Sequence, residues 1–226
     1  MTSNRDSASL SPAELGIILL QDSDNYTNQQ GLPMCGRYYL APDALEDVLR
    51  YCDRKLNRIP DWKAKDIHPT DAAPVLAADR AGAVEMQFQH WGFSGFDGKG
   101  VIFNARTETV LEKKMFAESM RERRAVIPAS SFYEWDAAKQ KWTFRRKDGK
   151  TLFLGGFWKT EHDADRFVIL TTKPNKSMKP VHDRMPLILE ADEIRPWILT
   201  DSYREILSKG CPELGRNTTF EQMRLF

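Results

Sequence analysis

The sequence predicts an α+β fold: a mostly antiparallel β sheet with a barrel-like core and helices at its periphery. From residue 37 onward, short segments of alternating apolar and polar residues recur, whereas helical patterns are few and scattered. Strands and helices do not alternate in the β-α-β order that builds a parallel sheet. With 226 residues, of which 41% are hydrophobic and 29% charged, the chain can bury a substantial core as one large domain.

Each predicted element follows from a local pattern. Pro42, directly after a strand-like segment, suits the first turn of a helix. The turn at 80–82 separates two alternating segments, and residues 147–150, Lys-Asp-Gly-Lys, have the composition of a hairpin turn between two strands. Strands are predicted at 37–40, 73–76, 83–91, 124–128, 131–135, 142–146, 152–158 and 167–172. Helices are predicted at 41–49, 107–120, 191–199 and 202–207.

Residues 1–34 are predicted to be an extension outside the functional domain, and residues 35–226 a single domain. The extension is rich in Ser, Asn, Asp and Gln, and its one apolar patch, at 15–20, is far shorter than the ~18 residues of a membrane span. The patch also lacks the small-residue cleavage site of a signal peptide. We therefore expect no association with a membrane.

Charge and cysteine usage narrow the class of protein. The net charge is +1, but residues 35–226 hold 32 basic against 28 acidic residues and are mildly basic. Mixed basic runs at 121–124 and 145–147 could contact phosphates, although such runs are usually solvated faces. Three scattered cysteines form no disulfide framework and indicate a reducing, cytoplasmic compartment.

No cofactor or metal is expected. Histidines and cysteines lack the spacing of zinc ligands, and the chain contains neither a Gly-rich phosphate loop nor a GxSxG elbow. Any chemistry must therefore come from the side chains themselves. Four segments carry residues suited to it.

The first segment is Met34-Cys35-Gly36-Arg37. If Cys35 were the N-terminal residue, an α-amine with a pKa of ~7.8 would stand beside a thiol with a pKa of ~8.5. The amine could form a Schiff base with an aldehyde, and the thiol could then close a thiazolidine ring. Gly36 removes steric bulk and Arg37 can hold an anion. Taken alone, however, a cysteine is more often a small buried hydrophobe than a nucleophile.

The second segment, 102–109, delivers Asn104 and Arg106 from a strand into a turn that starts a helix. Asn104 can orient an amine or a substrate oxygen, and Arg106 can grip a phosphate near a helix N-terminus. The competing interpretation is that Asn104 caps the helix and Arg106 is solvated. The segment alone favours this second interpretation.

The third segment, 131–135, places Glu134 among bulky aromatic residues. In a strand, Glu134 would share a face with Phe132, and burial there would raise its pKa toward the range useful for an acid or a base. The same alternation is equally compatible with Glu134 on the solvent face.

The fourth segment, 180–186, places His182 beside Asp183 and Arg184 between two prolines. An imidazole can move protons near neutral pH, and its charged neighbours can hold the ring or an anion. Among the histidines of the chain, His182 has the surroundings best suited to catalysis.

Taken together, the four segments stand in the order and spacing of the SRAP (SOS-response-associated peptidase) family, which the chain resembles. The matching motifs are Cys-Gly-Arg at 35–37, Asn-Ala-Arg-Thr-Glu-Thr at 104–109, Phe-Tyr-Glu-Trp at 132–135 and His-Asp-Arg-Met-Pro at 182–186. Supporting matches, including Trp91 and Thr171, extend the resemblance from residue 34 to about residue 209.

The resemblance implies the SRAP fold and a sensor that crosslinks itself to abasic sites in single-stranded DNA. It also raises lyase activity as a further expectation. It implies that Cys35 forms the thiazolidine, Asn104 orients its amine, Glu134 protonates the sugar oxygen and His182 moves protons at the Schiff-base stage. It further implies a set of residues near the DNA, with the arginines on phosphates and the tryptophan near the bases. This set is Arg37, Arg106, Trp91, Thr171 and Arg184.

One departure from the family concerns the start of the chain. Family members begin at Met-Cys, whereas 33 residues precede Met34 here, so the nitrogen of Cys35 is an amide that cannot form a Schiff base. We therefore expect the functional form to begin at Cys35, through a start at Met34 or removal of the leader. We expect a monomer that joins the bacterial nucleoid when bound to DNA. Two alternatives stay open: a cysteine autopeptidase that removes the leader, and a non-covalent single-stranded DNA-binding module.

Overall fold

The computed structural model describes residues 36–54, 61–95 and 98–218. Its helices are α2 (Pro42–Leu49), α3 (Lys114–Glu122), the 3₁₀ helix η2 (Ala191–Glu193), α4 (Ile194–Leu199) and α5 (Tyr203–Ser208). Its strands are β1 (Tyr38–Leu40), β2 (Lys65–Ile67), β3 (Ala72–Ala78), β4 (Val84–Trp91), β5 (Phe93–Ser94), β6 (Val101–Ile102), β7 (Asn104–Arg106), β8 (Arg124–Ala129), β9 (Ser131–Trp135), β10 (Lys141–Arg146), β11 (Leu152–Glu161), β12 (Ala164–Thr172), β13 (Met185–Pro186), β14 (Ile188–Leu189) and β15 (Leu214–Thr218).

Five strands close into a barrel. The order β12-β4-β3-β8-β11 returns to its start because β11 also pairs with β12. Every pair in this ring is antiparallel except β12 with β4, and β7 lies parallel to β12 outside the ring. Closure leaves the barrel without free sheet edges. The predicted α+β, mostly antiparallel barrel with peripheral helices is confirmed.

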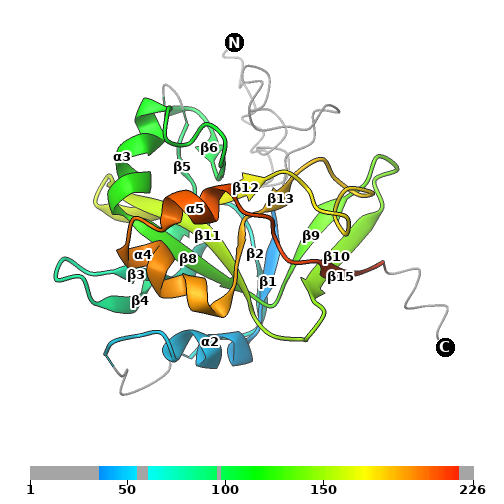
Figure 1. Ribbon diagram of the computed structural model, residues 1–226, viewed down its shortest axis with the longest axis horizontal. Helices are drawn as coiled ribbons and strands as arrows, with labels where there is room; N and C mark the ends of the chain where they lie inside the picture. The colour runs from blue at the N-terminus through cyan, green and yellow to red at the C-terminus, as the bar shows by residue number, and fades with distance from the viewer. Residues whose placement is uncertain (1–35, 55–60, 96–97, 219–226) are drawn as a thin grey trace, which may run out of the picture.

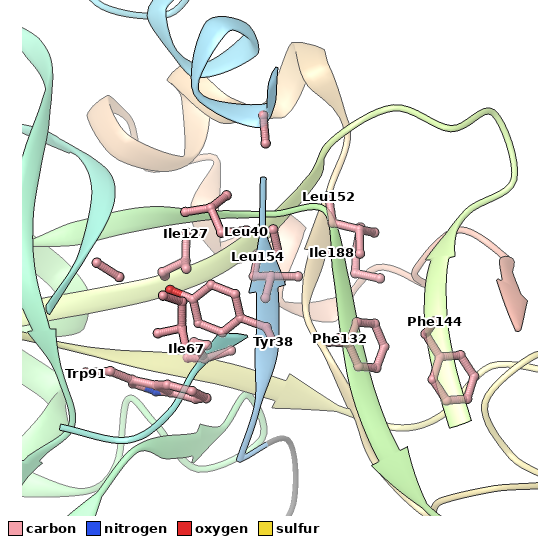
Figure 2. Close-up of a cluster of buried hydrophobic side chains, with 14 of the residues drawn as sticks. Tyr38, Leu40, Ile67, Trp91, Ile127, Phe132, Phe144, Leu152, Leu154 and Ile188 are labelled. Carbon is pink, nitrogen blue, oxygen red and sulfur yellow. The ribbon is translucent and has the colours of Figure 1, made fainter. Parts of the chain in front are cut away.

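A second antiparallel sheet, in the order β15-β10-β9-β1-β2, packs against one face of the barrel strands. Its inward residues Tyr38 and Phe132 join a buried cluster with Trp91, Ile127 and Leu154, which come from the barrel (Figure 2). Phe132 and Phe144 stack with their ring centroids 5.1 Å apart. Apolar residues of β1, β9 and β10 therefore pack this sheet against the barrel.

Helices α3, α4 and α5 cover the opposite face of the barrel strands (Figure 1). Helix α2 contributes to both apolar clusters, through Ala44 and Leu45 to the first and through Val48 to the second. Phe116 of α3 packs against Phe157 of β11, with ring centroids 5.5 Å apart. Trp197 of α4 is buried and donates a hydrogen bond from Nε1 to the carbonyl of Ala125, at 3.0 Å. Alternate residues of each barrel strand thus serve two separate apolar layers.

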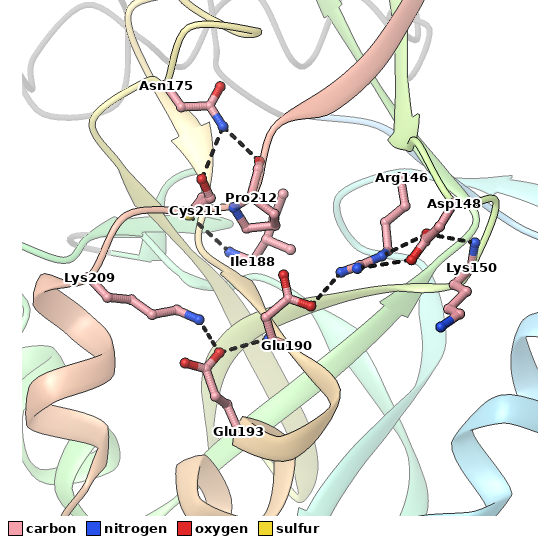
Figure 3. Close-up of polar contacts among 10 residues, drawn as sticks. All are labelled: Arg146, Asp148, Lys150, Asn175, Ile188, Glu190, Glu193, Lys209, Cys211 and Pro212. Atoms are coloured by element: carbon pink, nitrogen blue, oxygen red, sulfur yellow. Dashed lines mark hydrogen bonds and ion pairs between the residues drawn. The ribbon is translucent and has the colours of Figure 1, made fainter.

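A polar network ties the segment before β15 to the body of the protein (Figure 3). Asn175 donates from Nδ2 to the carbonyls of Cys211, at 3.2 Å, and Pro212, at 2.7 Å. Its Oδ1 accepts from the backbone nitrogens of Ser177 and Met178. The same side chain therefore anchors the loop after β12, which carries His182, to the C-terminal segment.

Two local predictions were wrong, and both failed for lack of tertiary information. The helix predicted over 107–120 begins only at Lys114, because Thr107 donates its backbone N–H to the carbonyl of Thr171 in β12, at 2.9 Å. The turn at 147–150 exists, with Gly149 at φ +73°, but its flanking strands do not form a hairpin. β10 pairs with β9 and β15, whereas β11 pairs with strands of the barrel, so this turn connects two sheets.

Candidate functional site

The start of β1 lies beside Glu134. Cys35 itself lies outside the described residues, which begin at Gly36. Tyr38 stands opposite Phe132, and Tyr133 donates its backbone N–H to the carbonyl of Arg37, at 3.1 Å. Continuing this antiparallel register by two residues from Tyr38 sets Gly36 opposite Glu134.

Gly36 also adjoins the strand that carries Asn104. A β-carbon at Gly36 would lie 3.9 Å from the ring of Phe103, the residue before Asn104. Asn104 is 4% exposed and stands opposite Ile169 in the parallel pair of β7 with β12. Asn104 therefore lies in a short strand that pairs with β12 outside the ring of the barrel, and it does not cap a helix.

The structure resolves the open question about Glu134. Its side chain is 1% exposed and lies on the inward face of β9 together with Phe132. Trp142 of β10 stands directly opposite Glu134. A carboxyl group in such a buried setting is a candidate acid or base.

His182 is buried in a loop that packs into the same apolar cluster as β1. Its neighbours Val181 and Met185 belong to the cluster that contains Tyr38 and Phe132. Burial lowers the pKa of His182, and the nearby carboxylate of Asp183, with Oδ1 3.1 Å from Nδ1, opposes that shift without overcoming it. The lowered pKa favours the neutral imidazole at neutral pH.

The three arginines expected at the site have different surroundings. Arg37 forms an ion pair with Asp66, and its guanidinium carbon lies 5.3 Å from the centre of the Tyr133 ring. Arg106 is partly exposed and forms no ion pair with any residue that the structure describes. Arg184 is engaged by Glu108. Of the three, Arg106 is the most available to an anion.

Trp91 does not occupy the position expected for a residue that stacks on bases. It is 0% exposed, lies parallel to Phe167 at a centroid distance of 6.2 Å, and donates from Nε1 to the carbonyl of Phe103, at 2.9 Å. Thr171 is also 0% exposed, and its hydroxyl donates to the carbonyl of Ala105, at 3.4 Å. Both side chains support the strands beneath the site and offer no surface to DNA.

Glu108 and Asp66 are partners that the sequence did not single out. Each contacts an arginine of the predicted site: Glu108 binds Arg184 and Asp66 binds Arg37. Glu108 belongs to the motif 104–109, and its acidic charge two residues after Arg106 was the available signal. The partner of each carboxylate lies far away in sequence, so spacing alone did not identify it.

Within the described residues, no group of three or more His, Cys, Asp and Glu side chains could hold a metal ion. No helix in those residues has the length and apolarity needed to cross a bilayer. The buried polar side chains of the candidate site are Asn104, Glu134 and His182.

These features define a class of protein: a closed β barrel with buried Asn, Glu and His residues that come from three separate segments of the chain. The family model described as SOS response associated peptidase (SRAP) matches residues 34–220. The chain belongs to the SRAP family.

Two curated relatives illustrate the similarity. The chain is 27% identical over 194 residues to the abasic site processing protein YedK of Escherichia coli, covering 79% of this chain and 87% of that protein. It is 28% identical over 193 residues to the abasic site processing protein YMR114C of Saccharomyces cerevisiae, covering 70% of this chain and 52% of the yeast protein. The match therefore spans most of the bacterial relative and about half of the yeast relative.

Solved structures share the fold at lower identity. A protein from Bacteroides thetaiotaomicron superposes with a TM-score of 0.66 at 20% identity, covering 81% of this chain and 91% of that one. A phage-related protein from Bordetella bronchiseptica gives a TM-score of 0.67 at 22% identity, covering 82% and 94%. These similarities establish the fold and carry no information about activity.

Proposed function

We propose that the protein processes abasic sites in DNA, and that it does so by forming a covalent crosslink with the lesion in single-stranded DNA. Relatives named abasic site processing proteins match most of the domain. The observation that carries the proposal is the setting of Gly36, the residue after Cys35: a β-carbon there would lie 3.9 Å from Phe103, next to Asn104, and the register of β1 with β9 continues from Gly36 to Glu134.

The chemistry begins with the free α-amine of Cys35. An abasic sugar in its open-chain form exposes an aldehyde, which the amine attacks to give a Schiff base and one molecule of water. The thiol then adds to the imine carbon and its proton passes to the nitrogen, which closes a thiazolidine. No oxidant, metal or cofactor is needed for this sequence.

The buried polar side chains would supply positioning and proton transfer. Asn104 would orient the amine, Glu134 would protonate the sugar oxygen during ring opening, and His182 would act at the Schiff-base stage. Arg37 and Arg106 would bind phosphates that flank the lesion, since guanidinium groups bind phosphate oxygens bidentately. The protein would associate with DNA through these contacts without reading the sequence of the bases.

The proposal requires that the amine of Cys35 be free. We would incubate abasic single-stranded DNA with protein that begins at Cys35 and with protein that begins at Met1, and separate the products on a denaturing gel. We expect a stable complex with the first protein and none with the second. Cys35→Ala should abolish the complex, whereas Cys52→Ala, at a partly buried cysteine of α2's C-terminal turn, should not. A crosslink from the Met1 form with its leader intact would contradict the proposal.

A second candidate function is cysteine autopeptidase activity, which the description of the matching family favours. In this reaction the Cys35 thiolate would attack the carbonyl of Met34, assisted by His182 and Glu134, so that the acyl group moves from the nitrogen to the sulfur of Cys35 and the α-amine becomes free. Water would then hydrolyse the thioester, which releases residues 1–34 as a carboxylic acid and restores the thiol. Intact mass spectrometry of freshly expressed protein tests it. Wild type should lose the leader while Cys35→Ala keeps it, and equal retention in both would exclude self-cleavage. Salt-sensitive DNA binding that survives Cys35→Ser, without any adduct, would instead indicate a non-covalent binding module.

A further inference from the structure

Glu108 clamps the side chain of Arg184. Both carboxylate oxygens of Glu108 accept hydrogen bonds from Arg184, Oε1 from Nη1 and Oε2 from Nη2, each at 2.7 Å. Nη2 also donates to the carbonyl of Thr171, at 2.7 Å. Paired bonds of this kind fix the plane of the guanidinium as well as its position. The turn after β7, the end of β12 and the loop of His182 are thereby tied together.

The clamp is charged at neutral pH. Burial alone would raise the pKa of Glu108, but the hydrogen bonds from Arg184 outweigh it and hold that pKa below its usual value. The side chain of Arg184 is only 12% exposed, so water competes weakly for its donors. Its guanidinium is consequently less available to a DNA phosphate than that of Arg106.

The backbone of Arg184 determines which nitrogen of His182 carries the proton. The backbone N–H of Arg184 donates to Nδ1 of His182, at 3.1 Å, so Nδ1 must present its lone pair. Burial favours the neutral ring, and in a neutral ring that accepts at Nδ1 the single proton belongs on Nε2. The competing tautomer, with the proton on Nδ1, would instead donate to Oδ1 of Asp183, which lies 3.1 Å from Nδ1.

We propose that Glu108 is a positioning residue: by clamping Arg184, it holds His182 as the Nε2–H tautomer, ready to donate a hydrogen bond to an oxygen of the abasic sugar. Nε2 is buried and has no hydrogen-bond partner in the described part of the chain, so an acceptor supplied by a ligand would satisfy it. The sugar as acceptor rests on the proposed function, whereas the clamp and the tautomer do not.

Nuclear magnetic resonance of the full chain, labelled with ¹⁵N-histidine and free of DNA, tests the tautomer. The chain has four histidines, and His182→Gln assigns the signal of interest. We expect the Nε2–H pattern for His182 in wild type and a mixture of tautomers in Glu108→Gln. The matched control is Glu112→Gln, at an exposed glutamate four residues later that forms no ion pair with any described residue, and it should give the wild-type pattern.

Arg184→Gln provides a second route to the same result. It keeps the backbone N–H of residue 184 but removes the guanidinium, so it should produce the same mixture as Glu108→Gln even if the latter folds poorly. The double variant should be no worse than either single variant, because the two residues act as one unit. An Nδ1–H or doubly protonated His182 in wild type, or an unchanged tautomer in both single variants, would overturn the proposal.

The rate of crosslinking shows how loss of the contact between Glu108 and Arg184 affects the proposed reaction. Glu108→Gln in the Cys35-initiated protein should slow crosslinking to abasic single-stranded DNA by about tenfold, an effect taken by analogy from the residues that orient metal-binding histidines. Its affinity for undamaged single-stranded DNA should not fall, because removing a negative charge cannot weaken attraction to a polyanion. Equal losses of rate and affinity would indicate a merely structural role and contradict the proposal. If wild type forms no crosslink, the proposed function fails while the spectra still decide the tautomer.

Discussion

The helix-covered face of the barrel and the candidate site both bury polar groups, but they satisfy them differently. Arg124 behind the helices is 6% exposed, and its donors all meet backbone carbonyls, those of Met120, Arg121, Trp197, Ile198 and Thr200. At the site, Nε2 of the buried His182 has no partner in the described residues. A fully satisfied buried group stabilises the fold, whereas an unsatisfied one costs stability and is available to a ligand.

The largest expected effect is on the chemistry at the site. Glu134→Gln in the Cys35-initiated protein should slow crosslinking by about a hundredfold or more, because an amide cannot protonate the sugar oxygen. The change is nearly isosteric, so the melting temperature should stay close to that of wild type. Single-turnover crosslinking and thermal melting measured on one sample would test both statements. Loss of folding with normal crosslinking by the residual folded protein would show Glu134 to be structural.

The helix-covered face should behave in the opposite way. Arg124→Met should lower the free energy of unfolding by roughly 2 to 3 kcal/mol, because several buried carbonyls lose their donor. Folded Arg124→Met should still crosslink at the wild-type rate. Arg123→Met, at an arginine whose ion pairs are with exposed glutamates, is the control and should change stability little. Chemical denaturation of the three proteins decides the comparison.

A substitution at Trp91 tests whether this residue supports the fold or contacts DNA. Trp91→Phe removes the hydrogen bond to Phe103 and some buried volume, and should cost roughly 1 to 2 kcal/mol of stability. Affinity for single-stranded DNA should not change, since the indole is fully buried. A loss of affinity equivalent to a stacked base, roughly 1 to 3 kcal/mol, would restore the role expected from the family resemblance.

The smallest expected effect is on the pH dependence of stability. The folded-state pKa of His182 is lowered by burial, so below about pH 6.5 the unfolded chain binds more protons than the folded chain. The contribution of His182 to stability is therefore complete above about pH 6.5 and declines as the pH falls through that value. It levels off once the folded ring is protonated. His182→Gln should remove this part of the slope. His162→Asn, at an exposed histidine with φ +49°, is the control and should leave the slope that comes from His182 unchanged.

The sequence was sufficient for the type of fold and for the segments of the site. Alternating segments predicted the paired strands β3 and β4, and their antiparallel register is found from Ala72 with His90 to Ala78 with Val84. The sequence did not predict which strands pair when they are far apart along the chain. The turn at 147–150 has hairpin composition, but the strands on either side of it belong to different sheets. Phe144 and Leu152 pack into the same buried cluster from these two sheets, so their strands face each other across the core instead of pairing.

The orientation of individual side chains also depends on partners distant in sequence. Alternation left the face of Glu134 undecided, and the pairing of β9 with both β1 and β10 decides it. Trp91 lies in a motif that suggested contact with bases, but Tyr38 and Phe103 enclose it. Glu108 seemed to belong to a helix because its partner, Arg184, is 76 residues away. The motifs named the candidate residues, and tertiary contacts determine the surroundings of each side chain.

Intact mass spectrometry of the crosslink tests the central claim most directly. Protein that begins at Cys35, incubated with an abasic single-stranded oligonucleotide, should yield one adduct whose mass is the sum of the two components less one water. The adduct should also resist denaturation without a reducing agent, because the thiazolidine ring closes onto the Schiff base. An adduct that retains residues 1–34, or one that forms equally with Cys35→Ala, would contradict the role of the Cys35 amine and thiol.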